Sequence, residues 1–108
     1  MVFGGTLLFN YFIKKNINDF KTQTIGNKSW YDVCSKQRSG EIKEAISIAN
    51  ELIELTPNYP EGHTRLGHLY IISGDLPKSK EHFEKAYNLF PSNENKENLD
   101  AIIKRINN

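Results

Sequence analysis

The stretch Gly67–Pro91, GHLYIISGDLPKSKEHFEKAYNLFP, decides the fold. It reads as two amphipathic helices joined by a tight turn at Ser73-Gly74-Asp75. Small residues fall where one helix must press close to another, at Gly67, Ser79 and Ala86. Pro91 ends the second helix, because proline lacks an amide proton and disfavours helix in the residue before it. The stretch therefore predicts a helical hairpin.

The hairpin pattern occurs twice, at a shift of 34 residues. The matched positions are Ser39 with Ser73, Gly40 with Gly74, Leu55 with Leu89 and Pro57 with Pro91. One helix pair of this size cannot bury its apolar stripe alone, so neighbouring pairs must stack. The repetition predicts an all-α array of helix-turn-helix units.

The second unit resembles the tetratricopeptide repeat. Six features stand at the family's positions: Leu66-Gly67, Tyr70, Gly74-Asp75, Phe83, Ala86 and Pro91. His63 takes the place of the family's large first residue, and Ser79 that of its usual Ala. The first unit matches more loosely, at Gly40, Ala45 and Pro57. The resemblance implies an α–α superhelix of tetratricopeptide-like repeats.

The resemblance sets the expected domain organisation. A tetratricopeptide-like domain is predicted over residues 29–108, with repeat 1 at about 27–59, repeat 2 at 60–93 and a capping helix at 94–107. The capping helix begins after Ser92-Asn93 and carries one apolar stripe, made of Leu99, Ile102, Ile103 and Ile106. Two units and a cap fall short of the three repeats usually needed, so an additional N-terminal helix is expected to cover the open end.

The N-terminal segment, residues 1–22, differs from the rest, and residues 23–28 read as a linker. The apolar run at residues 2–13 is shorter than the roughly 20 residues of a membrane span, and the basic Lys14-Lys15 follows it rather than preceding it as in a secretory signal. Two interpretations stay open. The spacing of Phe9, Ile13, Ile17 and Phe20 favours a packed or homo-oligomer-forming helix. The near-continuous apolar character favours a membrane-proximal anchor with the domain on the cytoplasmic side.

Composition excludes several classes of protein. A length of 108 residues suits one domain, and a formal net charge of +1 gives no basic footprint for nucleic acid. Cys34 is the only cysteine, so an intramolecular disulfide is impossible and a reducing compartment is favoured. The sequence therefore predicts a cytoplasmic protein, with membrane association through residues 2–13 as the open alternative.

No group of residues resembles a catalytic or metal site. His63 and His68 are five residues apart, which does not place them on one helical face, and His82 lies on the next helix. We interpret all three as helix-surface histidines. Cys34 lacks any catalytic signature, and no glycine-rich phosphate loop is present. We expect no enzymatic activity, no cofactor and no metal.

The resemblance instead implies a binding surface, because in this family the first helix of each repeat lines a concave groove that holds an extended peptide or a partner helix. The residues at these positions are Trp30, Tyr31, Glu61, Thr64, Arg65, His68, Ile71 and Ile72, with Asn27, Cys34 and Gln37 less firmly assigned. Trp30 has an equally strong alternative as a core residue. The family's clamp for chaperone carboxylates is not expected, since Trp30, Cys34 and His68 stand where it needs Lys, Asn and Asn.

The sequence thus predicts a non-enzymatic adaptor that binds a protein or peptide through its first-helix face. Two alternatives stay open. The first is a membrane-anchored assembly factor tethered by the N-terminal apolar segment, and the second is the C-terminal fragment of a larger enzyme.

Overall fold

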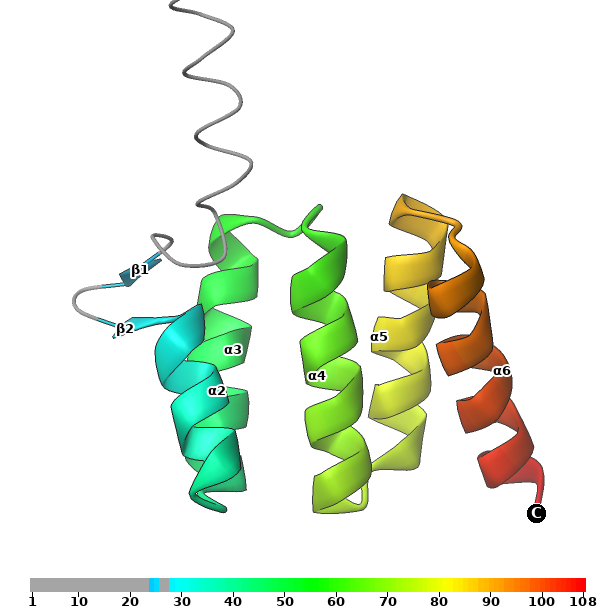
Figure 1. The fold of residues 1–108 in the computed structure, drawn as a ribbon, viewed down its shortest axis with the longest axis horizontal. Coiled ribbons are helices and arrows are strands. Elements are labelled where there is room, and N and C mark those ends of the chain that lie inside the picture. The colour runs from blue at the N-terminus through cyan, green and yellow to red at the C-terminus, as the bar shows by residue number, and fades with distance from the viewer. Residues whose placement is uncertain (1–23, 26–27) are drawn as a thin grey trace, which may run out of the picture.

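A computed structural model describes residues 24–25 and 28–108 of the chain. Its elements are β1 (Thr24–Ile25), β2 (Lys28–Ser29), α2 (Trp30–Arg38), α3 (Ile42–Leu55), α4 (Pro60–Ser73), α5 (Leu76–Leu89) and α6 (Asn93–Asn107). Figure 1 shows the helices standing side by side in one row. The prediction of an all-α array of helix-turn-helix units is confirmed. The expected N-terminal helix in residues 1–22 lies outside the described residues.

The described part of the predicted linker contains a short antiparallel ladder instead of open loop. Thr24 pairs with Ser29 and Ile25 with Lys28. The ladder leads directly into α2, where the Ser29 amide donates a hydrogen bond of 2.6 Å to the carboxylate of Asp32. That bond satisfies an amide that a helix start otherwise leaves without a partner.

Helix packing follows chain order. Apart from weaker contacts, α2 packs on α3, α3 on α4, α4 on α5 and α5 on α6. No helix within residues 28–108 is long and apolar enough to cross a lipid bilayer. Stability in such a row comes from interfaces between successive helices rather than from one central core.

The two glycine turns have the same backbone conformation. Gly40, between α2 and α3, has a φ of +82°, and Gly74, between α4 and α5, has a φ of +90°. This left-handed region is one that glycine adopts without steric cost. After the second turn, the Lys78 amide donates to Asp75 Oδ1 over 3.2 Å and so begins α5. The 34-residue match of the sequence is therefore a match of turn geometry.

Trp30 lies in the core, as its alternative interpretation predicted, and its assignment to the binding surface is wrong. Its side chain is 1% exposed, and its ring centroid lies 6.0 Å from that of Tyr59. Gly62 of α4 makes room for it, because a Cβ added there would stand 2.9 Å from Trp30 Cζ2. The core around it is built from Val33, Ala45, Ile48, Ala49, Leu52, Ile53, Leu66, Leu69 and Tyr70.

The small residues of α4 and α5 mark a close helix contact, as predicted. A Cβ added to Gly67 would stand 2.6 Å from Phe83 Cδ1, so the Phe83 ring packs directly on the α4 backbone. The buried Ser79 hydroxyl donates to the Gly67 carbonyl over 2.8 Å. The close approach leaves no room for a larger side chain at Gly67 unless the Phe83 ring or the helix moves.

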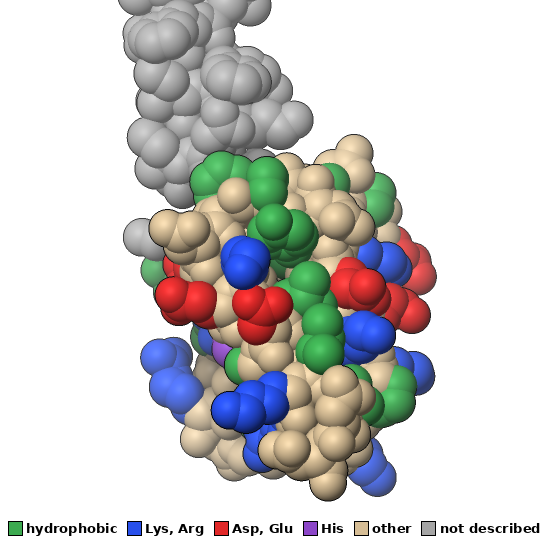
Figure 2. Space-filling model, turned by 90° about the vertical axis from the view of Figure 1, so that its right-hand side faces the viewer, with side chains coloured by type: hydrophobic (Ala, Val, Ile, Leu, Met, Phe, Trp, Pro, Cys, Tyr) green, Lys and Arg blue, Asp and Glu red, His purple; other side chains and the backbone are tan. Residues whose placement is uncertain are grey.

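The α6 helix closes the row. Of its predicted apolar stripe, Ile102 is buried, Leu99 and Ile103 are half-buried, and Ile106 is 40% exposed. Figure 2, which faces this end of the molecule, shows hydrophobic side chains running between basic and acidic ones. The stripe therefore packs on α5 only along part of its width.

Candidate binding groove

A groove with a volume of about 410 Å³ lies between α4 and the beginning of α6. Its two walls come from parts of the chain some 30 residues apart. The lining residues are Pro60, Glu61, Thr64, Arg65 and His68 on one wall, and Phe90, Ser92, Glu94 and Asn95 on the other.

The α4 wall is one face of a helix. Glu61, Thr64, Arg65 and His68 are spaced by three, one and three residues, which places their side chains along one side. The opposite side of α4 carries the buried Leu66, Leu69 and Tyr70 and is packed against α3 and α5. Pro60 begins the helix, where its missing amide proton costs no hydrogen bond.

Asn95 builds the second wall. Its buried side-chain amide donates to the Phe90 carbonyl over 2.7 Å and to the Ala86 carbonyl over 3.3 Å, which satisfies the end of α5. Its backbone amide donates to Ser92 Oγ over 3.1 Å and so starts α6. These bonds fix the turn that carries Phe90, whose ring is 60% exposed. An exposed aromatic ring is thus held at the rim of the groove.

The groove contains charges of both signs. Glu61 and Glu94 are exposed carboxylates, and Arg65 is a half-buried guanidinium. Burial of the His68 ring, followed by the nearby positive charge of Arg65, lowers the pKa of His68 below its usual value, and Glu94 opposes this only in part. The ring packs edge-on against Phe83 at 5.1 Å between centroids. At neutral pH His68 is therefore a neutral donor and acceptor rather than a cation.

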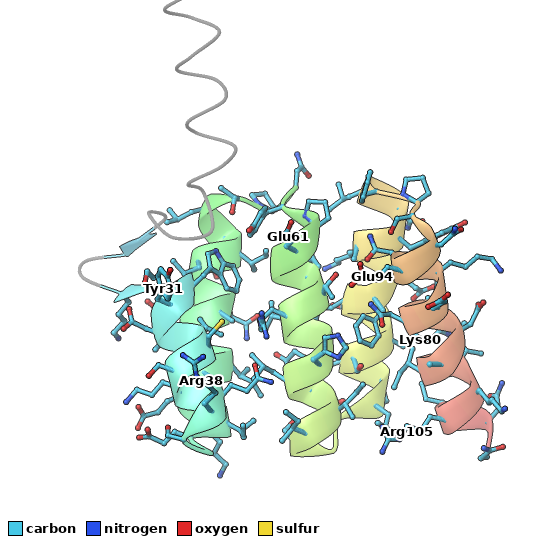
Figure 3. All side chains as sticks on the ribbon, viewed as in Figure 1. Tyr31, Arg38, Glu61, Lys80, Glu94 and Arg105 are labelled. Carbon is cyan, nitrogen blue, oxygen red and sulfur yellow. The ribbon has the colours of Figure 1, made fainter. Side chains whose placement is uncertain are left out.

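The first-helix face continues from α4 to α2. Arg65 Nη1 lies 3.5 Å from Gln37 Oε1, and Tyr31 on α2 is 53% exposed. In Figure 3, Tyr31, Glu61 and Glu94 lie toward the same end of α2, α4 and α6. The α2, α4 and α6 helices therefore present one surface, of which the groove is the hollowed part.

The structure brings together half of the residues that the sequence assigned to binding. Glu61, Thr64, Arg65 and His68 line the groove. Ile71 is half-buried and Ile72 is exposed, but neither lines it. Tyr31 belongs to the continuing surface on α2, and Asn27 lies outside the described residues.

The second wall was missed, although the repeat period contains its signal. A shift of 34 residues takes Pro60 to Glu94 and Glu61 to Asn95. The α6 helix therefore occupies the position of a third first helix. The prediction of a capping helix did not include the residues by which α6 lines the groove.

The histidines correct a second prediction. His63 and His82 are buried, not on the helix surface, and their Nδ1 atoms lie 3.0 Å apart. His63 Nε2 lies 2.7 Å from the Pro57 carbonyl oxygen. Within residues 28–108 no group of three or more His, Cys, Asp or Glu side chains is placed to hold a metal ion. The pair is a packing element between α4 and α5.

Comparison with known proteins agrees with this geometry. Residues 60–93 match the tetratricopeptide repeat family. Over 63 residues the chain is 33% identical to the heat shock protein STI1 of Saccharomyces cerevisiae, a match that covers 57% of this chain and 11% of that protein. The chain thus spans about a tenth of the length of this curated relative. The predicted tetratricopeptide resemblance is confirmed, and the helical row has the corresponding repeat fold.

Proposed function

We propose, on the premise that residues 60–93 form a tetratricopeptide repeat, that this chain is a non-enzymatic module that binds a peptide or protein segment in the α4–α6 groove. The tetratricopeptide match at residues 60–93, together with 33% identity to a heat shock protein over 63 residues, supports a role in protein interaction. Recognition would come from shape and hydrogen bonding, with Arg65 and His68 as polar contacts and Phe90 as an apolar one.

The convergence of Glu61, Thr64, Arg65 and His68 in one open groove carries the proposal. The opposite helix face carries the buried core residues of α4, and of these four side chains His68 also packs on Phe83 and Arg65 contacts Gln37. Arginine and exposed aromatic residues contribute strongly to protein interfaces. An extended segment would lie between the two walls and contact both.

A peptide selection tests the proposal. The full chain, immobilised, is used to select binders from a random peptide library, and each selected peptide is then measured by fluorescence anisotropy. We expect selected peptides to bind the unaltered chain and to lose at least about tenfold in affinity, or about 1.4 kcal/mol, for an Arg65→Ala/His68→Ala variant.

The matched control is Lys43→Ala/Lys104→Ala, which alters exposed residues outside the groove. It should bind as the unaltered chain does, and circular dichroism should show equal helix content in all three proteins. Failure to select any peptide, or equal binding by the groove variant, would overturn the proposal.

The apolar run at residues 2–13 supports a narrower proposal, that the module is tethered to a membrane or held in a homo-oligomer. Deleting residues 1–22 separates these roles. A tether predicts that the shortened protein leaves the membrane fraction while keeping its helix content. A homo-oligomer predicts that light scattering gives the shortened protein the mass of a single chain and the full chain a multiple of its own. Unfolding of the remainder would contradict both and make the segment part of the core. The cytoplasmic location stays a prediction.

A further inference from the structure

Two carboxylates face the same end of the groove from opposite walls. Glu61 stands in the first turn of α4 and Glu94 in the first turn of α6, and both line the hollow. The ion pairs among residues 28–108 join other side chains, so neither carboxylate is neutralised by a lysine or arginine of the described chain. Among the described residues, the Tyr59 hydroxyl donates a hydrogen bond of 3.3 Å to Glu61. This end therefore carries two formal negative charges, which the dipoles of α4 and α6 offset only in part.

The groove offers little positive charge to offset it. Arg65 lies one turn further along α4 and also contacts Gln37 of α2. His68, the other basic residue of the groove, has a pKa that partial burial of its ring and then the charge of Arg65 lower below its usual value, which disfavours its cationic form. The field at the Phe90 end of the groove therefore attracts cations and repels acidic ligands.

An apolar surface stands beside the carboxylates. The Phe90 ring is 60% exposed, and Pro60 lies at the same end of the groove on the opposite wall. A lysine or arginine side chain matches this combination, because its aliphatic stem packs on apolar surface while its charged head stays near acidic groups. A free metal ion or a small anion would not use the ring.

We propose that the Phe90 end of the groove binds a lysine or arginine side chain of the peptide, seated between Glu61 and Glu94 with its stem on Phe90. The inference rests on the proposed function and names the chemistry of its ligand. The rigid turn held by Asn95 presets the distance between the ring and the α4 wall. Arg65, further along, would then contact peptide carbonyls or an acidic residue, so the two charge signs would also set the direction of the bound peptide.

The same two glutamates have a local role that the experiment must separate from binding. An acidic residue in the first turn of a helix stabilises that helix through its dipole. Glu54→Gln/Glu84→Gln controls for the change in net charge, because it removes two exposed carboxylates on α3 and α5, outside the groove and outside the first helical turn. Melting temperatures of both variants are recorded alongside binding.

The test compares peptides selected from a random library by the full chain. We expect enrichment of lysine or arginine next to an apolar residue, and affinity that falls as salt is raised. Replacing that basic residue by alanine, or using Glu61→Gln/Glu94→Gln, should each weaken binding by about tenfold, and combining them should add little more. The control variant should bind as the unaltered chain does.

Charge reversal sharpens the result. Glu61→Lys/Glu94→Lys should prefer the same peptide with glutamate in place of its basic residue. Selected peptides that lack a basic residue, or unchanged binding by the Glu61→Gln/Glu94→Gln variant, would overturn this inference while leaving the proposed function standing. Absence of any selected peptide that depends on Arg65 and His68 would overturn the proposed function itself.

Discussion

Nδ1 of His63 on α4 lies 3.0 Å from Nδ1 of His82 on α5, inside the helical pair. The Pro57 carbonyl can only accept, so His63 Nε2 donates to it over 2.7 Å. In neutral His63 the remaining Nδ1 is therefore an acceptor, and His82 Nδ1 must be the donor. The His82 ring stacks between those of His63 and Tyr70, at 5.3 and 5.6 Å between centroids. The hydrogen-bonded chain links the α3–α4 loop to α5 and requires both rings to be neutral or to share one proton.

Acid should weaken the fold through this pair. Burial, then the neighbouring His63 and Lys85, lowers the pKa of His82 to about 4 from 6.5, with Glu81 opposing and Lys78 adding to the effect. Because the unfolded chain binds the proton more tightly, the stabilisation is complete above pH 6.5 and is lost as pH falls toward 4. At about 1.4 kcal/mol for each pH unit between these values, the loss is on the order of 3 kcal/mol. Urea unfolding across this range measures it.

A variant separates the contribution of His82 to the loss of stability in acid from the contribution of the Asp and Glu side chains. His82→Phe keeps an aromatic ring beside Tyr70 but cannot titrate, so its stability should fall less steeply between pH 6.5 and 4. His68→Gln, on the exposed side of α4, should retain most of the slope. Equal slopes for the unaltered chain and His82→Phe would show that the pair does not couple folding to protons.

Trp30 should report burial directly, because it is the only tryptophan. Its fluorescence should be blue-shifted and poorly quenched by acrylamide in the folded chain and red-shifted on unfolding. Replacing it with alanine should cost about 3–5 kcal/mol in urea unfolding, since a large buried ring leaves a cavity. Arg38→Ala, at an exposed position of the same helix, should change stability by no more than about 0.5 kcal/mol. A solvent-exposed emission spectrum would contradict its place in the core.

The contact between Gly67 and Phe83 should tolerate no added carbon. Gly67→Ala would force the ring or the helix to move and should destabilise the chain by about 1–3 kcal/mol, despite the better helix propensity of alanine. Phe83→Leu in the same chain should recover part of the loss, so that the two changes are not additive. Ser35→Ala, at an exposed position of α2, serves as the control in the same unfolding assay.

Asn95→Ala should loosen the turn that carries Phe90. The substitution leaves the Phe90 and Ala86 carbonyls without this partner, a loss of about 1–3 kcal/mol for a buried polar contact. Hydrogen exchange should quicken at residues 90–95, and peptide affinity should fall with it. The exposed Asn88→Ala is the matched control and should alter neither. Unchanged exchange in Asn95→Ala would mean that the turn is held by other contacts.

The 34-residue repeat period predicted the features that depend on local backbone conformation, such as the glycine turns. Gly40 and Gly74 adopt the same positive φ because both terminate a helix of the same unit. The outer face of α4 followed from helical spacing, since one side of that helix had to be core. Both predictions needed only distances along the chain.

The remaining features depend on how whole helices are rotated against each other. His63 and His82 are 19 residues apart, and only the packing angle of α4 on α5 brings their rings together. Trp30 turns inward because Gly62, on another helix, leaves space for it. Such contacts between distant residues leave no periodic signal in a single sequence.

The serial arrangement of the helices has a mechanical consequence. Because each helix packs mainly on its neighbours in the chain, every helix interface carries a force applied to the two ends, and the weakest interface should open first. We expect the row of helices to extend in steps under tension, one helix interface at a time. A peptide that contacts both α4 and α6 would link two helices that are otherwise joined through α5. Ligand binding should therefore raise the force needed to separate these helices.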